Sequence, residues 1–227
     1  MAEDSENKLH LPEQDQLEAY AKRLLEFVKA KQKILIAAAA AVVLVAAAVA
    51  GVVYFQKKAE EKAQTLLGSA LAQIQTAARN QASDEQYGRI QARLQKIVEQ
   101  YGSTSAGKAS MLKYADLSYQ QGDYETAITM YQRALEAYKD DPGFYTLVMN
   151  GLAYCYEAKE NYAKAASCFR RIVEKQSAVM KDQALFNLGR MYAKTGETEK
   201  RRQVYERLAS EHPDSMYARL AEKMPSG

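Results

Sequence analysis

The chain of 227 residues contains no tryptophan, only two cysteines, two histidines and four prolines. Two histidines, His10 and His212, argue against a histidine-based metal site or a catalytic triad. The sequence also has no phosphate-binding loop, no GxGxxG motif and no HExxH motif. We therefore predict that the protein is not an enzyme and that it binds no metal and no cofactor.

Strand patterns and a strong charge of one sign are missing as well. No alternation of β-branched and polar residues lasts more than a few positions, and no proline interrupts a segment of helical periodicity. The net charge of +3 divides into −1 for residues 1–33 (6 Lys/Arg, 7 Asp/Glu) and +4 for residues 56–227 (25 and 21). This small balance gives no electrostatic support for nucleic-acid binding. The absence of strand patterns, together with the uninterrupted helical periodicity, predicts an all-α fold.

One long apolar run is present: "ILIAAAAAVVLVAAAVAGVVYF", residues 34–55, has no charged residue. At about 1.5 Å per residue, a helix of this length matches the roughly 30 Å hydrocarbon layer of a bilayer. We predict a transmembrane helix over 34–55. A cleaved signal peptide is the alternative, because Ala48-Val49-Ala50 before Gly51 has the form that signal peptidase accepts.

Lysine and arginine residues near the run predict its orientation. Five lie in the 15 residues before it and three in the 15 after it, which favours a cytoplasmic N-terminus and a translocated C-terminal domain. Residues 1–14 read as a disordered cytoplasmic tail and 15–33 as an amphipathic helix. That helix has two readings: it lies on the lipid surface, or it docks on a protein partner. Its apolar residues are Leu17, Tyr20, Ala21, Leu24, Phe27 and Val28.

The remainder of the chain is helical and repetitive. "YADLSYQQGDYETAITMYQRAL" from Tyr114, "LAYCYEAKENYAKAASCFRRIV" from Leu152 and "LGRMYAKTGETEKRRQVYERLA" from Leu188 align at intervals of 38 and 36 residues. Small residues recur in the first helix of each unit and an aromatic residue in the second. The equivalent positions are Ala115, Ala153 and Gly189, and then Tyr131, Phe169 and Tyr205.

These units resemble tetratricopeptide repeats. The resemblance implies an α-solenoid of about four helical hairpins with a capping helix. The degenerate first hairpin covers 56–107, three repeats cover 108–213, and the cap covers 214–227. The small residue that opens the second helix is Ala127 and then Ala165, but the third unit has Arg201 there, which puts a tight helix crossing in doubt in that unit.

The register of this family also implies a partner-binding groove, formed by one face of each first helix. Its three aromatic residues would be anchors on an open face, and Arg190 and Lys194 would receive a carboxylate of the bound protein. The implied groove residues are Leu112, Asp116, Tyr119, Asn150, Tyr154, Glu157, Phe186, Arg190 and Lys194.

The two cysteines, Cys155 and Cys168, fall on the two helices of one repeat. C-x12-C without neighbouring ligands is no zinc pattern. We expect two buried, unpaired thiols, with a disulfide as the alternative in an oxidising compartment.

The order of parts, from "DQLEAYAKR" through one span to the repeats, resembles the YfgM family of bacterial inner-membrane proteins. The resemblance implies a single-pass inner-membrane protein with a periplasmic C-terminal domain. It also implies contact with the Sec translocon, periplasmic chaperones or exported clients, and assistance in their export or folding. Two alternatives stay open: an envelope-assembly scaffold for outer-membrane biogenesis or cell division, and a structural repeat protein that self-associates.

Overall fold

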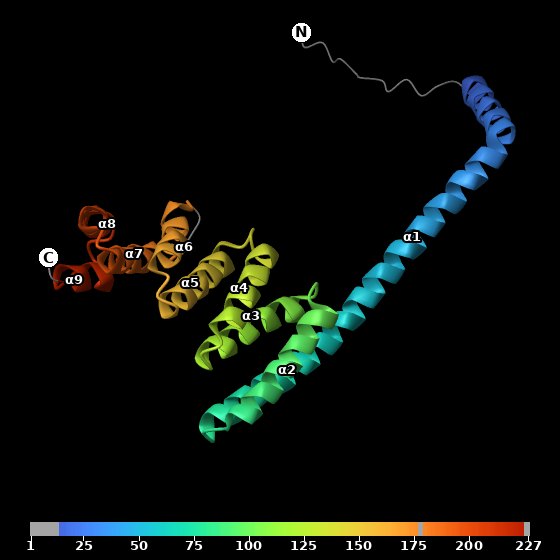
Figure 1. The fold of residues 1–227 in the computed structure, drawn as a ribbon. Coiled ribbons are helices and arrows are strands. Elements are labelled where there is room, and N and C mark those ends of the chain that lie inside the picture. The colour runs from blue at the N-terminus through green and yellow to red at the C-terminus, as the bar shows by residue number, and fades with distance from the viewer. Residues whose placement is uncertain (1–13, 177–178, 225–227) are drawn as a thin grey trace, which may run out of the picture. The chain divides into compact units, whose positions relative to one another are not determined.

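A computed structural model of the chain describes residues 14–176 and 179–224; the predicted disordered tail, apart from its last residue, lies outside this range. The described residues form nine α-helices and no strand, which confirms the all-α prediction. The chain divides into two units, Met1–Gln56 and Lys57–Gly227. Figure 1 shows the long helix α1 and the succession of shorter helices that follow it.

Helix α1 runs from Gln14 to Arg79 as one element of 66 residues. The sequence predicted three separate helices here: the amphipathic helix, the span and the start of the first hairpin. They are continuous because no proline interrupts them, and because the junctions are rich in Lys, Ala and Glu, which favour helix. By length and composition, α1 is the one described helix that qualifies as a membrane span, and its side chains from 18 to 50 are exposed.

The C-terminal unit, residues 57–227, is a series of antiparallel helix pairs and is called the repeat unit below. The C-terminal part of α1 packs on α2 (Asp84–Tyr101), where Ala70 and Ala77 meet Ile90 and Leu94. Three hairpins and a short last helix follow. They are α3 (Ser105–Gln120) with α4 (Tyr124–Ala137), α5 (Pro142–Ala158) with α6 (Tyr162–Glu174), α7 (Lys181–Thr195) with α8 (Thr198–Glu211), and α9 (Met216–Glu222).

Small residues allow the paired helices to approach. Ala127 and Ala165, which open the second helices, are completely buried. In the third repeat a Cβ on Gly189 would overlap the ring of Tyr205, so this position has no room for a side chain. Arg201 stands at the equivalent of Ala165 and is half-buried. The third hairpin therefore uses glycine on its first helix, where the others use alanine.

In the first two hairpin turns, the side chain of the residue before the second helix caps that helix. Asp123 and Asn161 cap α4 and α6, because their side chains accept hydrogen bonds from the N–H groups of Thr126 and Lys164. The residue just before the capping residue takes a left-handed conformation in the second turn, where Glu160 has φ 57°. Glycine occupies the corresponding place in the first turn, Gly122 with φ 78°. Glycine is the residue that adopts such values without steric cost.

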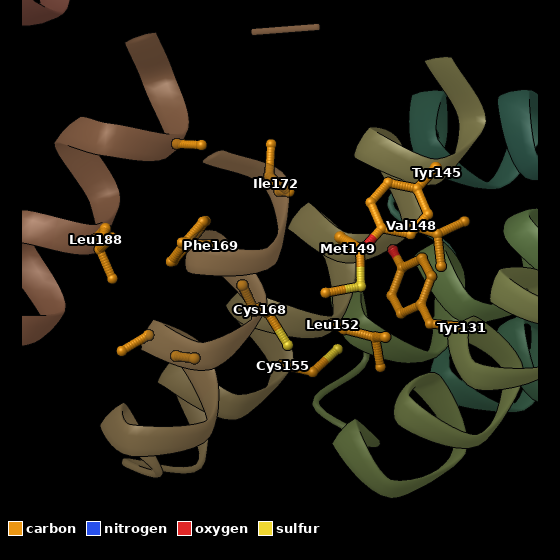
Figure 2. Packing of buried hydrophobic residues seen from close by; sticks show 14 of the residues in the cluster. Tyr131, Tyr145, Val148, Met149, Leu152, Cys155, Cys168, Phe169, Ile172 and Leu188 are labelled. Atoms are coloured by element: carbon orange, nitrogen blue, oxygen red, sulfur yellow. The ribbon is translucent and has the colours of Figure 1, made fainter. Parts of the chain in front are cut away.

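Both cysteines are buried free thiols, as the sequence predicted. Figure 2 shows Cys155 of α5 and Cys168 of α6 as neighbours inside the apolar core. Burial raises the pKa of Cys155 to about 12 and that of Cys168 to about 11. Since the thiolate is the reactive form, both thiols are inert at neutral pH in the folded chain.

A carboxylate of α1 fixes the beginning of the first repeat. Glu60 accepts hydrogen bonds from the backbone N–H groups of Ser105 and Ala106, at 2.6 and 3.1 Å. The side chain of Thr104 accepts from the next one, that of Gly107. The first turn of α3 has no partner for these donors within its own helix. Glu60 therefore caps α3 from a position 45 residues earlier in the chain.

This cap predicts the effect of removing one carboxylate. Glu60→Ala should lower the free energy of unfolding of the detergent-solubilised chain by about 1 kcal/mol, because two N–H groups lose their acceptor. Glu61→Ala, next to it and exposed, should change it by less than about 0.5 kcal/mol. Urea denaturation followed by circular dichroism measures both. Equal losses would show that Glu60 does not cap α3.

Candidate functional site

The first helices α3, α5 and α7 carry the nine predicted groove residues, but the structure does not leave all of them accessible. Leu112 of α3 and Asn150 of α5 are buried, so their assignment to an open surface is corrected. Leu112 belongs to the apolar core of the repeats, so the face expected from the register is closed at these two positions. The other seven are half-buried or exposed.

On α3, Asp116 is already engaged by its own repeat. It accepts a hydrogen bond from the hydroxyl of Tyr131 on α4 at 2.6 Å, and the ammonium of Lys113 lies 3.3 Å away. Burial, and then the Asp116 carboxylate, raise the pKa of the Tyr131 phenol well above its usual range. The ring of Tyr131 fills the space beside Gly151 on α5, where a Cβ would overlap it. Asp116 and Tyr131 thus bind α3, α4 and α5 together.

A polar bridge joins α5 to α7 across this face. The hydroxyl of Tyr154 accepts N–H groups from Gln183 and Asn187, at 3.4 and 3.2 Å. The guanidinium of Arg190 donates to Glu157 at 2.7 Å and to Asn187 at 2.8 Å. Arg190 is therefore already paired within the repeats, and its role as a receptor for a partner's carboxylate stays a prediction.

Lys194, the second residue predicted to receive a carboxylate, also has a partner within the repeats. Lys194 is exposed, and its ammonium lies over the ring of Tyr162, 5.9 Å from the centroid. A cation held against an aromatic face keeps its charge but loses part of its freedom.

Two of the three predicted aromatic anchors belong to the packing of the repeats. Tyr154 meets Phe169 edge to face at 5.8 Å between ring centroids. Phe186 stacks on Tyr205 of α8 at 6.2 Å and also contacts Tyr217 of α9 at 5.6 Å. Of the three, only Tyr119 is classed as exposed, with 37% of its surface accessible. The expectation of three open anchors is therefore corrected.

Leu147 of α5 is an exposed residue of this face that the sequence reading missed. It is 54% exposed and lies seven residues, or two helical turns, before Tyr154. Near the start of the same helix, Phe144 is 40% exposed and stacks on Tyr138 at 4.3 Å. The signal was present in the sequence: a leucine one turn before Asn150 shares its helix face.

Two first helices, α5 and α7, each carry an unsatisfied buried acceptor. Among the described residues, the side-chain oxygens of Asn150 and Gln183 are buried without a hydrogen-bond partner. No group of three His, Cys, Asp or Glu side chains in the described part of the chain is placed to hold a metal ion. The surface thus offers aliphatic and aromatic area beside a polar network, and this combination suits contact with another polypeptide.

Comparison with known protein families gives matches to the repeat region. Two models described as "Tetratricopeptide repeat" match residues 107–178 and 150–215. A search of curated protein sequences gave no match to this chain.

Two solved structures share the fold. A tetratricopeptide repeat protein from Parabacteroides merdae is 14% identical with a TM-score of 0.58; the match covers 71% of this chain and 58% of that protein. The nearly identical repeats of a putative kinesin light chain from Podosopora anserina are 13% identical with a TM-score of 0.52, covering 69% of this chain and 82% of that one. At these identities the likeness concerns the fold alone.

The polar bridge predicts a measurable coupling between α5 and α7. A double-mutant cycle with Glu157→Ala and Arg190→Ala should give an interaction energy of about 1 kcal/mol or more, because both side chains are largely shielded from water. Arg202 and Glu206, paired on the exposed side of α8, are the control and should give about 0.3–0.5 kcal/mol. Urea denaturation supplies the energies. Equal couplings would mean that the bridge does not join the repeats.

Proposed function

Because residues 107–215 are tetratricopeptide repeats, we propose that this chain is a membrane-anchored module that binds polypeptide through its first helices. The observation that carries the proposal is that Tyr119 of α3 and Leu147 of α5 are both exposed on successive first helices. Tyr119 lies at the end of α3 and Leu147 near the start of α5, and the polar bridge of Tyr154 and Glu157 begins seven residues after Leu147 on α5. The chain is proposed as an interaction protein without catalytic activity.

The anchor in this proposal is residues 34–55 of α1, with the N-terminus in the cytoplasm. Its support is the uncharged run, its length and the five-to-three distribution of basic residues. The repeats would then lie in the periplasm of a bacterial envelope. The order of parts favours a role beside the export channel, with translocon subunits, chaperones or exported proteins as partners. A scaffold for envelope assembly is the second candidate, and copurification from solubilised membranes separates the two.

Binding can be measured with a photocrosslinking amino acid in place of Gln120, which is exposed beside Tyr119 on α3. In intact cells we expect adducts with other proteins. The double substitution Tyr119→Ala and Leu147→Asp should lower their yield at least tenfold, equivalent to about 1.4 kcal/mol of binding energy. The melting temperature should change little, because both side chains are exposed.

The matched control is on α4, where Thr129 and Arg133 are exposed on the second helix of the first repeat. Thr129→Asp with Arg133→Ala should leave the yield unchanged. Equal yields in all three proteins would place the binding surface outside the first helices. A lower melting temperature in the first pair would mean that these residues are part of the core.

Topology is tested independently of binding. Protease added to spheroplasts should digest residues 60–227 and spare the N-terminal segment, because the apolar run separates them. The intact chain in lysed membranes is the control for accessibility. Protection of the repeats until lysis would show that the orientation is reversed. A mature N-terminus at Gly51 would show that the run is removed as a signal peptide.

A further inference from the structure

A shallow cavity of ≈ 430 Å³ lies at the beginning of the repeat unit, between α1 and the end of α2. It combines basic, polar and apolar side chains within three turns of one helix. The lining residues are Lys58, Glu61, Lys62, Thr65, Leu66 and Tyr101.

The side chains that line this cavity carry a net positive charge. Lys58 and Lys62 are exposed, and neither has an ion-pair partner among the described residues. Glu61 is the one carboxylate in the lining, so the site carries a formal charge of +1 (two lysines minus one glutamate). Leu66, which is 45% exposed, and the half-buried Tyr101 add apolar wall. Such a site suits a monoanion that carries polar and apolar parts.

The cavity lies close to the end of the apolar run on α1, which favours an anion of the membrane surface. Lys58 and Lys62 lie three and seven residues beyond Phe55, the last residue of the apolar run. At 1.5 Å per residue these are about 5 and 10 Å along the helix. The headgroup layer on each side of a bilayer is about 5–8 Å thick. Lysine side chains reach several ångströms toward such a layer from either side.

We propose that this cavity binds the phosphodiester headgroup of an anionic phospholipid. The ammonium groups of Lys58 and Lys62 would hold the phosphate, while Tyr101 and Thr65 face the polar group that it carries. Basic pockets between transmembrane helices bind anionic lipid headgroups in other membrane proteins, on the cytoplasmic side. Here the same chemistry would act just beyond a single span, on the translocated side. The inference rests on the membrane anchoring proposed above. It adds a bound lipid at the junction of the anchor and the repeats.

A second cavity on the same hairpin provides an internal comparison. Its volume is ≈ 600 Å³, and it also has two cations, Arg89 and Arg93. It begins at Ser69, 14 residues beyond Phe55, and thus about 21 Å along the helix. That is well outside the headgroup layer, so this cavity should show no preference for lipid.

The test uses the full-length chain reconstituted into nanodiscs with equal amounts of phosphatidylglycerol and phosphatidylcholine. After mild detergent extraction, mass spectrometry counts the lipids that stay with the protein. We expect about fivefold enrichment of phosphatidylglycerol, the effect of about one lysine near an anionic lipid. Lys58→Gln with Lys62→Gln should abolish the enrichment. Arg89→Gln with Arg93→Gln should leave it unchanged.

Two further measurements separate a defined site from general attraction of charge. Thr65→Trp fills the cavity without altering its charge and should also abolish the enrichment; retention of the enrichment would overturn the proposal. Inorganic phosphate in detergent micelles should not compete with phosphatidylglycerol, whereas full competition would indicate a site for free phosphate. Equal losses in the lysine and arginine pairs would likewise overturn it.

Failure of the proposed anchoring has a different signature. A chain that does not float with liposomes would overturn the anchor and the lipid site together. Flotation without enrichment would overturn the lipid site alone.

Discussion

The close approach of paired helices is the constraint on which the rest of the repeat unit depends. No single hairpin can bury its apolar face, so each one relies on contact with its neighbours. That contact requires positions without bulk, and the chain supplies them as Ala127, Ala165 and Gly189, all buried. Where one helix has a small residue, an aromatic side chain of the other helix fills the space, as Tyr205 does beside Gly189. At the last repeat, Tyr217 of α9 contacts Phe186 and closes the stack.

Contacts between neighbouring helices also determine which side chains of the predicted groove remain accessible. Tyr131 crosses from α4 to meet both Asp116 and the backbone beside Gly151, and Arg190 is drawn to Glu157. These contacts tie the first helices to neighbouring helices, because hydrogen bonds with a charged partner are stronger than neutral ones. They also occupy charged groups of this face. In the proposed binding role, the exposed apolar area, Leu147 above all, is what these contacts leave for a partner.

Helix α1 carries both the apolar run and the carboxylate that caps α3, with no loop between them. Its apolar run ends at Phe55, and only five residues later Glu60 accepts the first N–H groups of α3. Lys58 and Lys62 follow the run on the same helix, and together with Tyr101 of α2 they line a cavity.

The sequence by itself determined those features that depend on local periodicity and conformation. They include the all-α class, the three units with their small and aromatic positions, and the uncharged run. It did not determine that α1 is one helix, because each part of the segment is equally consistent with a separate element. It also named nine groove residues from the register but missed Leu147. The tertiary structure decided that Leu112 and Asn150 are buried, that Arg190 is paired, and that Tyr154 and Phe186 belong to the packing. Register tells which face of a helix a residue occupies, but exposure depends on what the next repeat places against that face.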